Sequence, residues 1–310
     1  MARILITGGT GFVGSNLASF YKHRHQVTIA SRRPPKEEVS SIIWNPLDVT
    51  DSKSTLHTLQ RFQPEVVIHC AGIKDVRYCE QNPEVAHKIN ALGTQAVASA
   101  CRIIGAKLIY LSTDLVFPCD RGGYRENDIP GSPIVYGRSK HQGELLAMQE
   151  IHNLAVCRSA GVYGHLSPLL QWLEKQVRLG QDVECFLDVS NSPTFADNLG
   201  EMLQAILDKD LTGIFHTAGC RKVNRYEFFA LFAHIFNLDS TLLKPSTLGD
   251  RRKQMLLMPD ASLNCDYSLD YLGVNSDSPA EGFLKLKASG EFHQPLQRGL
   301  AFENENFVRL

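Results

Sequence analysis

The sequence lacks an excess of charge of either sign. Its 310 residues include 32 Lys and Arg against 33 Asp and Glu, so the formal net charge is -1. Nothing in this balance marks the chain for nucleic acid or acidic membranes. The length is sufficient for a large core, in one big domain or two coupled ones.

Long hydrophobic runs and paired cysteines are missing as well. Every apolar run is far shorter than the ~20 residues of a membrane-spanning helix, and the first one breaks into glycines, which is unlike a signal peptide. The eight cysteines are scattered, with no Cys-x-x-Cys pair. Such usage is typical of a reducing cytosol, with neither a disulfide framework nor a zinc site. We expect a cytoplasmic protein without a metal, in which most cysteines are small core residues.

The N-terminus combines a strand pattern with a glycine-rich turn. Ile4, Leu5 and Ile6 form an apolar run typical of a buried parallel strand, and residues 12–20 read as a helix. Between them the spacing is Gly-x-x-Gly-x-x-Gly, not the usual Gly-x-Gly-x-x-Gly. Such a turn lets a pyrophosphate approach the backbone at a helix N-terminus. The expected dinucleotide-binding residues are Gly8, Thr10, Gly11, Phe12, Val13 and Gly14.

The second predicted strand, residues 26–30, is followed by arginines and not by an acid. An NAD-preferring site has an acidic residue here for the ribose hydroxyls. Arg32 and Arg33 stand where a 2′-phosphate would lie, and charge-assisted hydrogen bonds of ~1.5–3 kcal/mol each would favour NADPH over NADH. The alternative is an ordinary solvated basic loop. We expect NADP as the cofactor.

The third predicted strand ends in the small residues Cys70, Ala71 and Gly72, which let a cofactor pass close to the backbone. Lys74 follows at the edge where open parallel sheets bind ligands. It is a candidate contact for substrate or pyrophosphate, and an exposed lysine is the alternative. His69 lies inside the apolar strand, so we expect a hydrogen-bonded core histidine and not a catalytic base.

A tyrosine and a lysine lie four residues apart in the segment Tyr136–Lys140, so on a helix they share one face. The ordinary pKa of ~10 keeps a tyrosine protonated at neutral pH, and a neighbouring ammonium would lower that pKa toward the range of a general acid. Thr113, at the end of a predicted strand, offers a hydroxyl to hold a substrate oxygen. Alone the pattern is common and fits a surface tyrosine, but the N-terminal turn strengthens it.

Strand and helix patterns alternate through the first half of the chain. This alternation predicts an α/β fold with a doubly wound parallel (Rossmann) sheet. The further predicted strands are 64–72 with its terminal turn, 106–111 and 154–158, and the predicted helices are 83–105 and 136–149. The polar loop 118–132 is expected to cover the site as a flap.

The rhythm changes beyond Gly164. Helix patterns at 166–179, 196–208 and 224–237 become mixed with short strand patterns. The strand patterns lie at 183–187 and 213–216. We expect residues 1–160 to form an NADP-binding Rossmann domain. Residues 161–310 should form mainly a smaller α/β substrate-binding domain, interleaved with the last sheet strands.

Together these motifs resemble a known family. The blocks Thr7–Gly14, Ser112–Phe117, Tyr124–Asp128 and Pro133–Lys140 are similar to those of extended short-chain dehydrogenases/reductases, and in particular to the dTDP-4-dehydrorhamnose reductases and their relatives. The similarity runs along most of the chain and thins out after about residue 240. It implies hydride transfer from NADPH to a sugar-nucleotide ketone in the cytoplasm.

The resemblance also implies roles for individual residues. Tyr136 would protonate the carbonyl oxygen, Thr113 would hydrogen-bond to it, and Lys140 would grip the nicotinamide ribose. Further implied contacts are Asp48 and Val49 with the adenine, Asn90 with a water chain to the lysine, and Val116 with the substrate. A homodimer is compatible with the resemblance.

Three departures from the family pattern fall on the substrate side. The reductases usually have a tyrosine where this chain has Leu115, a tryptophan where it has Gly161, and an arginine-proline pair where it has Met258 and Pro259. The sugar therefore stays open, and a different deoxysugar or another carbonyl compound also fits.

Three alternative functions remain. A 4,6-dehydratase would need a glutamate at the position of Leu115, and an NAD-retaining epimerase would prefer the acid that is missing after the second strand. From a different class, a relative of this family is a non-catalytic, NADP-binding regulatory subunit of methionine adenosyltransferase. The intact set of Thr113, Tyr136 and Lys140 favours an enzyme.

Overall fold

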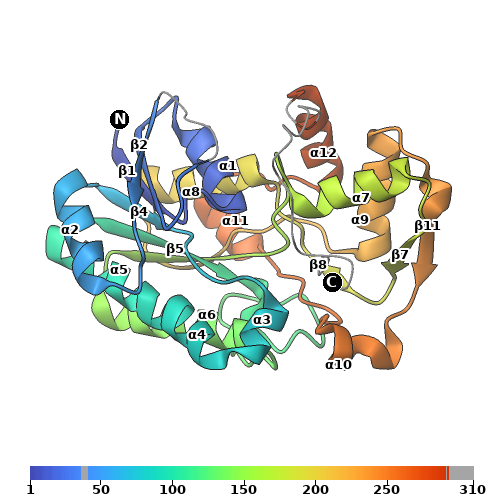
Figure 1. The fold of residues 1–310 in the computed structure, drawn as a ribbon, viewed down its shortest axis with the longest axis horizontal. Helices are drawn as coiled ribbons and strands as arrows, with labels where there is room; N and C mark the ends of the chain where they lie inside the picture. Colours follow the sequence, from blue (N-terminus) through green and yellow to red (C-terminus); the bar gives the residue numbers. More distant parts are fainter. Residues whose placement is uncertain (36–40, 291, 293–310) are drawn as a thin grey trace.

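The computed structural model describes residues 1–35, 41–290 and 292. At its centre is a parallel sheet with the strand order β3-β2-β1-β4-β5-β6-β9 (Figure 1). The strands are β1 Arg3–Thr7, β2 Gln26–Ser31, β3 Ile42–Pro46, β4 Val66–His69, β5 Lys107–Thr113, β6 Leu154–Ser159 and β9 Gly213–His216. The predicted doubly wound parallel sheet is confirmed. Its order reverses between β1 and β4, and ligands of such sheets bind at the carboxyl ends of strands at this reversal.

Helices cover both faces of the sheet, which explains why β4 and β5 are buried at every position. One face carries α2 Ser52–Phe62, α5 Gly93–Ile104 and α6 Val135–Glu150, and the other carries α1 Phe12–Tyr21, α8 Ala196–Asp208 and α11 Asp266–Leu272 (Figure 1). Leu17, Leu199 and Met202 pack in the core on the α1 side. Leu59 and Val97 pack in the core on the opposite side.

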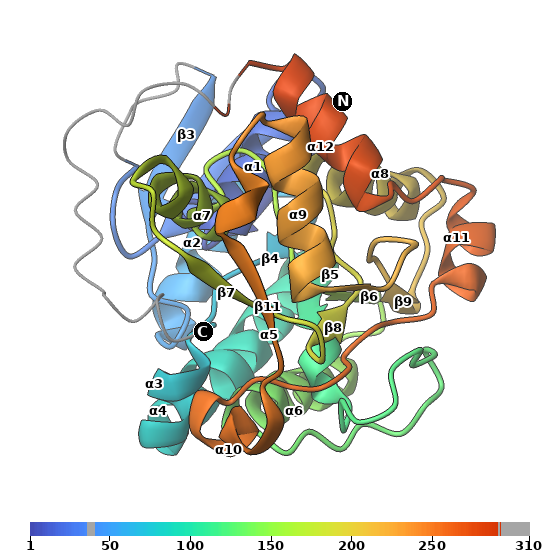
Figure 2. The ribbon, with the colours of Figure 1, turned by 90° about the vertical axis from the view of Figure 1, so that its right-hand side faces the viewer.

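A smaller set of elements lies beside the carboxyl ends of the strands (Figure 2). It contains α7 Pro168–Arg178, α9 Arg225–Ile235, α12 Pro279–Ala288, the parallel pair β7 Val183–Phe186 and β11 Leu243–Ser246, and the antiparallel pair β8 Ser190–Asn191 and β10 Val223–Asn224. Capping boxes formed by Asn224 with Glu227 and by Ser278 with Glu281 begin α9 and α12. An aromatic core that includes Phe232 holds these helices together.

The helix predicted over residues 83–105 is present, but it is not α-helical throughout. It consists of α4 Pro83–His87, a π-helical turn at Lys88–Leu92, and α5. The π-helical turn directs the Asn90 side chain toward the interior. There its Oδ1 accepts from the backbone N–H of Ile73 at 2.8 Å, and its Nδ2 donates to the Ile73 carbonyl at 3.0 Å. Apolar spacing alone does not reveal one extra residue in a turn.

The loop 118–132 is packed against the C-terminal part of the chain, so the prediction of a flap is wrong. Tyr124 is buried and exchanges backbone hydrogen bonds with Ser262 and Asn264, at 3.0 and 2.7 Å. Its ring stacks on Phe117, with centroids 4.6 Å apart. No residue of this loop lines the cavities described below. Polar groups of the loop also bond to one another, since Arg121 Nη2 and the Arg125 backbone N–H both donate to Asp128 Oδ2, at 2.6 and 2.8 Å.

All eight cysteines are free thiols, and six of them are buried, so the prediction that most are core residues is confirmed.

Within residues 1–35, 41–290 and 292, no helix has the length and apolar character needed to cross a membrane. Two other helices, α3 Val76–Gln81 and α10 Arg252–Met255, complete the lower edge in Figure 1.

A buried ion pair joins α6 to the end of the sheet. Glu144 and Arg158 are 1% and 2% exposed, and the Glu144 carboxylate accepts from Arg158 Nε at 3.0 Å and Nη2 at 2.8 Å. Ser112 donates to the same carboxylate at 2.5 Å. Burial alone would raise the pKa of Glu144, but hydrogen bonds from His141 and Arg158 outweigh it and lower the pKa to about 2.

We therefore expect Arg158→Met to lower the free energy of unfolding by ~3–5 kcal/mol, because it leaves the Glu144 charge buried and unpaired. Denaturant unfolding monitored by circular dichroism measures the loss. The matched control is Arg178→Met, which breaks a pair with Glu174 whose arginine is 57% exposed and should cost no more than ~1 kcal/mol. Equal losses in the two variants would contradict the structural role given to the buried pair.

Candidate active site

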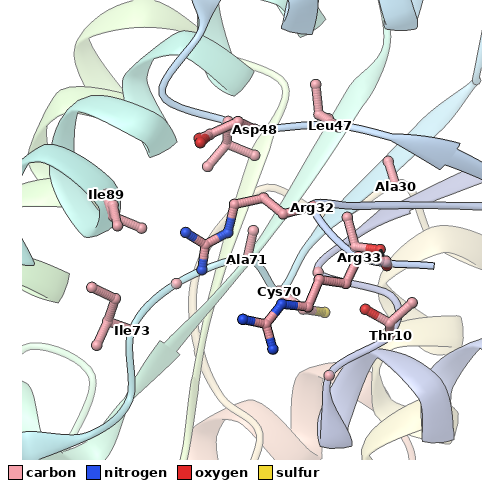
Figure 3. A pocket seen from close by; sticks show the side chains of 15 residues that line it. Thr10, Ala30, Arg32, Arg33, Leu47, Asp48, Cys70, Ala71, Ile73 and Ile89 are labelled. Carbon is pink, nitrogen blue, oxygen red and sulfur yellow. Dashed lines mark hydrogen bonds between the residues drawn. The ribbon is translucent and has the colours of Figure 1, made fainter. Parts of the chain in front are cut away.

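A cavity of about 360 Å³ lies at the ends of β1, β2 and β4. It is lined by the predicted cofactor residues Gly8, Thr10, Gly11, Arg32, Arg33, Asp48, Val49, Cys70, Ala71 and Gly72. Leu47, Ile73 and Ile89 add apolar side chains that the sequence did not single out (Figure 3). The sheet topology thus brings together, in one groove, segments that are up to about eighty residues apart in the chain.

The glycine turn has the geometry that a closely approaching ligand needs. Gly8 has φ +66°, and a side chain there would meet the Ala71 backbone nitrogen at 2.7 Å. A side chain at Gly14 would collide with the Gly8 carbonyl, so this glycine lets α1 pack against the turn. At Gly11 a side chain would meet only the Gly8 carbonyl, at 3.1 Å, and the surface over it is otherwise open. The residues present therefore fit a dinucleotide whose phosphates lie on the N-terminus of α1.

Arg32 and Arg33 both project their guanidinium groups into this cavity (Figure 3). Within the described residues, neither makes an ion pair with a carboxylate. Asp48 is held by Thr50, whose backbone N–H and hydroxyl donate to its Oδ1 at 2.9 and 2.8 Å. The Thr50 hydrogen bonds, and secondarily the charge of Arg32, lower the pKa of Asp48.

A second cavity of about 540 Å³ shares Gly8, Gly11 and Cys70 with the first and extends toward α9. From the cofactor side it is lined by Phe12, Val13 and Gly14. From the ends of the strands and the start of α6 it is lined by Lys74, Thr113, Asp114, Leu115, Tyr136 and Lys140. The two cavities therefore form one continuous cleft, with the tyrosine and threonine at its centre.

Tyr136 and Thr113 lie together as the sequence predicts, but the tyrosine pKa is not lowered. Burial raises the pKa of Tyr136 well above its ordinary value, against the opposing effect of its hydrogen bond with Thr113. Lys140 is held elsewhere, since its Nζ donates to the Leu111 carbonyl at 2.6 Å and lies 4.1 Å from the centroid of the Tyr110 ring. The prediction of an acidified phenol is therefore wrong, because desolvation outweighs the Thr113 hydrogen bond and the nearby Asp114 carboxylate raises the tyrosine pKa further.

Burial also shifts the other two ionisable groups at the centre of the cleft. It lowers the pKa of Lys140 to about 8 and raises the pKa of Asp114 to about 7. Asp114 accepts from the Thr113 hydroxyl at 2.8 Å, so it orients that hydroxyl. The sequence motifs include Asp114 only as part of the segment Ser112–Phe117 and give it no role of its own. Its position next to Thr113 is the feature from which a role could have been predicted.

Two predicted site residues lie outside the cavity walls. Val116 is fully buried in a cluster with Phe117 and Tyr124, so its assignment to the substrate site is wrong. Residues 114–116 form a 3-10 turn, which points Leu115 into the cleft in place of Val116. Asn90 is also buried, and besides holding Ile73 it donates to Ser139 Oγ at 3.0 Å, which links β4 to α6.

His69 is a satisfied core histidine, as predicted. Its Nδ1 lies 2.6 Å from the Thr7 hydroxyl and its Nε2 lies 3.0 Å from the Thr94 hydroxyl. Burial lowers the pKa of His69 to about 3, so it stays neutral. Elsewhere in the described chain, no group of three His, Cys, Asp or Glu side chains is arranged to hold a metal ion.

Known proteins resemble this chain along most of its length. The bovine (Bos taurus) methionine adenosyltransferase 2 subunit beta is 30% identical over 296 residues, which covers 89% of this chain and 84% of that protein. The probable low-salt glycan biosynthesis reductase Agl14 of Haloferax volcanii is 29% identical over 252 residues, covering 79% and 84%. The crystal structure of dTDP-4-dehydrorhamnose reductase from Bacillus anthracis in complex with NADP superposes with a TM-score of 0.79 at 23% identity, covering 93% and 99%.

These comparisons confirm the resemblance to the dTDP-4-dehydrorhamnose reductases and their relatives. The family model described as the RmlD substrate binding domain matches residues 2–267, which include every residue named above as lining the two cavities. Because this match spans well over half of the sequence, the chain belongs to the RmlD substrate-binding domain family.

Proposed function

We propose that the protein is an NADPH-dependent reductase of a nucleotide-linked 4-keto-6-deoxy sugar, similar to dTDP-4-dehydrorhamnose reductase. The observation that carries the proposal is the pairing of Tyr136 with Thr113 at the centre of a cleft that continues into the dinucleotide groove. A phenol and a hydroxyl beside that groove can protonate and hold a carbonyl oxygen.

NADPH, when bound, supplies the hydride for the carbonyl carbon. The chain provides the groove through the glycine turn at Gly8–Gly14 and the small residues Cys70–Gly72. Arg32 and Arg33 are the proposed ligands of the 2′-phosphate, because both enter the groove and neither pairs with a carboxylate of the described residues. Asp48 and Val49 are proposed to contact the adenine, and Lys140 the nicotinamide ribose.

Tyr136 is the proposed proton donor. Its raised pKa keeps the phenol protonated at neutral pH, which is the form that reduction of a ketone requires. In the structure the single Thr113 hydroxyl proton is donated to Asp114 Oδ1, and we propose that this hydroxyl turns to donate to the carbonyl oxygen when substrate binds. Proton transfer leaves a phenolate, and the Lys140 ammonium in the same cleft stabilises that charge. Asn90 is proposed to act through its hold on the β4 turn and Ser139.

The walls on the substrate side support a ketone-bearing group with apolar parts. Leu115, Leu257 and Met258 line the cleft together with Phe228, and the Asn191 side chain packs against Gly161 in the same wall. Lys74 is a proposed substrate contact at the same edge. We further propose that residues 1–160 bind the cofactor and 161–310 mainly bind the substrate, in a cytoplasmic protein that forms a homodimer.

A regulatory role is the second candidate. The similarity to methionine adenosyltransferase 2 subunit beta, at 30% identity over 296 residues, favours it directly. The two functions separate in one experiment, in which the purified protein is tested with a panel of 4-keto sugar nucleotides and NADPH absorbance is followed. Turnover supports the reductase. No turnover, together with co-purification of a methionine adenosyltransferase catalytic subunit, supports the regulator. Epimerase and dehydratase activities fit less well, since Arg32 and Leu115 replace the acids they need.

We expect Tyr136→Phe to leave NADPH affinity nearly intact and to reduce turnover by ~10²-fold or more, because only the proton donor is removed. Steady-state kinetics on the active sugar nucleotide measure turnover, and fluorescence titration measures NADPH binding. The matched control is Tyr226→Phe, which removes a hydroxyl from a tyrosine that is not part of the cleft wall. Unchanged turnover in Tyr136→Phe would overturn the assigned role.

Replacing both Arg32 and Arg33 with Ala should weaken NADPH binding by ~10²-fold or more while affecting NADH far less, because only NADPH carries the 2′-phosphate. Parallel titrations with the two cofactors measure the ratio of their dissociation constants. Lys53→Ala, a loss of charge on the exposed side of α2, serves as the control. A ratio unaltered by the double substitution would show that the 2′-phosphate is read elsewhere.

A further inference from the structure

Arg225 lines the far end of the cleft, in a position fixed by the backbone. It is the first residue of α9 and follows β10, which pairs with β8 across Asn191 and Ser190. Its backbone N–H donates to the Val189 carbonyl at 3.0 Å. Val189, Ser190 and Asn191 line the same cleft. The backbone of Arg225 is therefore hydrogen-bonded directly to the cleft wall.

The Arg225 guanidinium has no carboxylate partner in the described part of the chain. Other arginines of the protein do: Arg158 pairs with Glu144, Arg178 with Glu174 and Arg251 with Glu184. Arg225 is only half-exposed, and its guanidinium carbon lies 5.7 Å from the centroid of the Phe229 ring. Burial lowers its pKa, and no carboxylate among the described residues offsets this. A partly desolvated cation without a counter-ion gains more from binding an anion than a solvated one does.

The charge balance of the cleft points the same way. Its charged lining consists of Lys74, Lys140 and Arg225 against the single carboxyl of Asp114. Lys74 also makes no ion pair with a described residue, and its Nζ lies 5.7 Å from the centroid of the Phe12 ring. Lys140 and Asp114 belong to the catalytic centre. Arg225, at the start of α9, belongs neither to the glycine turn nor to the group around Tyr136. It is therefore a cation of the cleft without an assigned role.

We propose that Arg225 binds the diphosphate of a nucleoside-diphosphate-linked substrate and so fixes the substrate's register relative to Tyr136. This inference rests on the proposed function, and it adds the residue and the chemical group. The guanidinium presents paired N–H donors that match two phosphate oxygens, which a lysine at this position would not reproduce. Asn191, whose amide nitrogen lies where a side chain at Gly161 would have to be, adds a polar group to the same wall.

Equilibrium binding to the full-length, NADP-saturated protein tests this inference without turnover. Isothermal titration calorimetry with UDP and with dTDP is carried out on the wild type, Arg225→Gln and Arg225→Lys. The control Arg221→Gln removes an equal charge from an exposed residue nearby that is not part of the cleft wall. We expect Arg225→Gln to weaken both diphosphates by ~10–100-fold and Arg225→Lys to weaken them less, with Arg221→Gln near wild type. Uridine and thymidine, which lack phosphate, should bind all four proteins alike.

The outcomes separate this inference from the reductase proposal. Equal diphosphate affinity in wild type and Arg225→Gln overturns the role of Arg225, whether or not the protein reduces a ketone. Failure of the wild type to bind either diphosphate also overturns it. An equally large loss of NADP affinity in Arg225→Gln would place the arginine on the cofactor and overturn it as well. Selective loss of diphosphate binding supports it even if no sugar nucleotide is turned over, because only the catalytic step would then be missing.

Discussion

The close approach of α6 to the end of β5 is the constraint on which the candidate site depends. Glu144 accepts from Ser112, the residue before Thr113, and lies one turn beyond Lys140 on the same helix. Two glycines make the approach possible. A side chain at Gly137 would collide with the Leu115 carbonyl, and one at Gly143 would lie 2.5 Å from the Asn90 carbonyl. The distance between the tyrosine and threonine hydroxyls is thus set by packing and by a buried charge, both away from the reacting atoms.

The same burial that fixes this geometry drives the ionisable groups of the cleft toward their neutral forms. It raises the pKa of Asp114 to about 7, lowers that of Lys140 to about 8, and keeps Tyr136 protonated. An anion that enters the cleft reverses the shift on the lysine, because a nearby negative charge favours the ammonium. Binding of phosphate-bearing ligands and charging of Lys140 are therefore coupled. Under the proposed function, the lysine would become a better stabiliser of the Tyr136 phenolate once the cleft is filled.

Local patterns in the sequence were sufficient for the parts of the site that depend on local geometry. The glycine turn, Arg32 and Arg33 after β2, and the pair Tyr136 and Lys140 each lie within one short stretch of the chain, and all line the cleft. The errors arise where a turn changes the direction of side chains or where burial decides the chemistry. Because residues 114–116 form a 3-10 turn, Leu115 and not Val116 lines the cleft. The pKa of Tyr136 follows its desolvation, which no spacing encodes.

The omission of Arg225 has a different cause, since the helix at 224–237 is predicted correctly and the residue lies at its start. Arg225 stands out because no described carboxylate pairs with it. That lack of a partner can be recognised only in the folded structure, where segments distant in the sequence surround the arginine. Arg32 and Arg33 lie at one end of the cleft and Arg225 at the other, each without a described acidic partner. Arg225 is partly buried as well as unpaired, and such a cation reduces stability, so its place in the cleft wall is best explained by a ligand. Under the proposed function, phosphates held at the two ends bring the nicotinamide and the ketone together beside Tyr136.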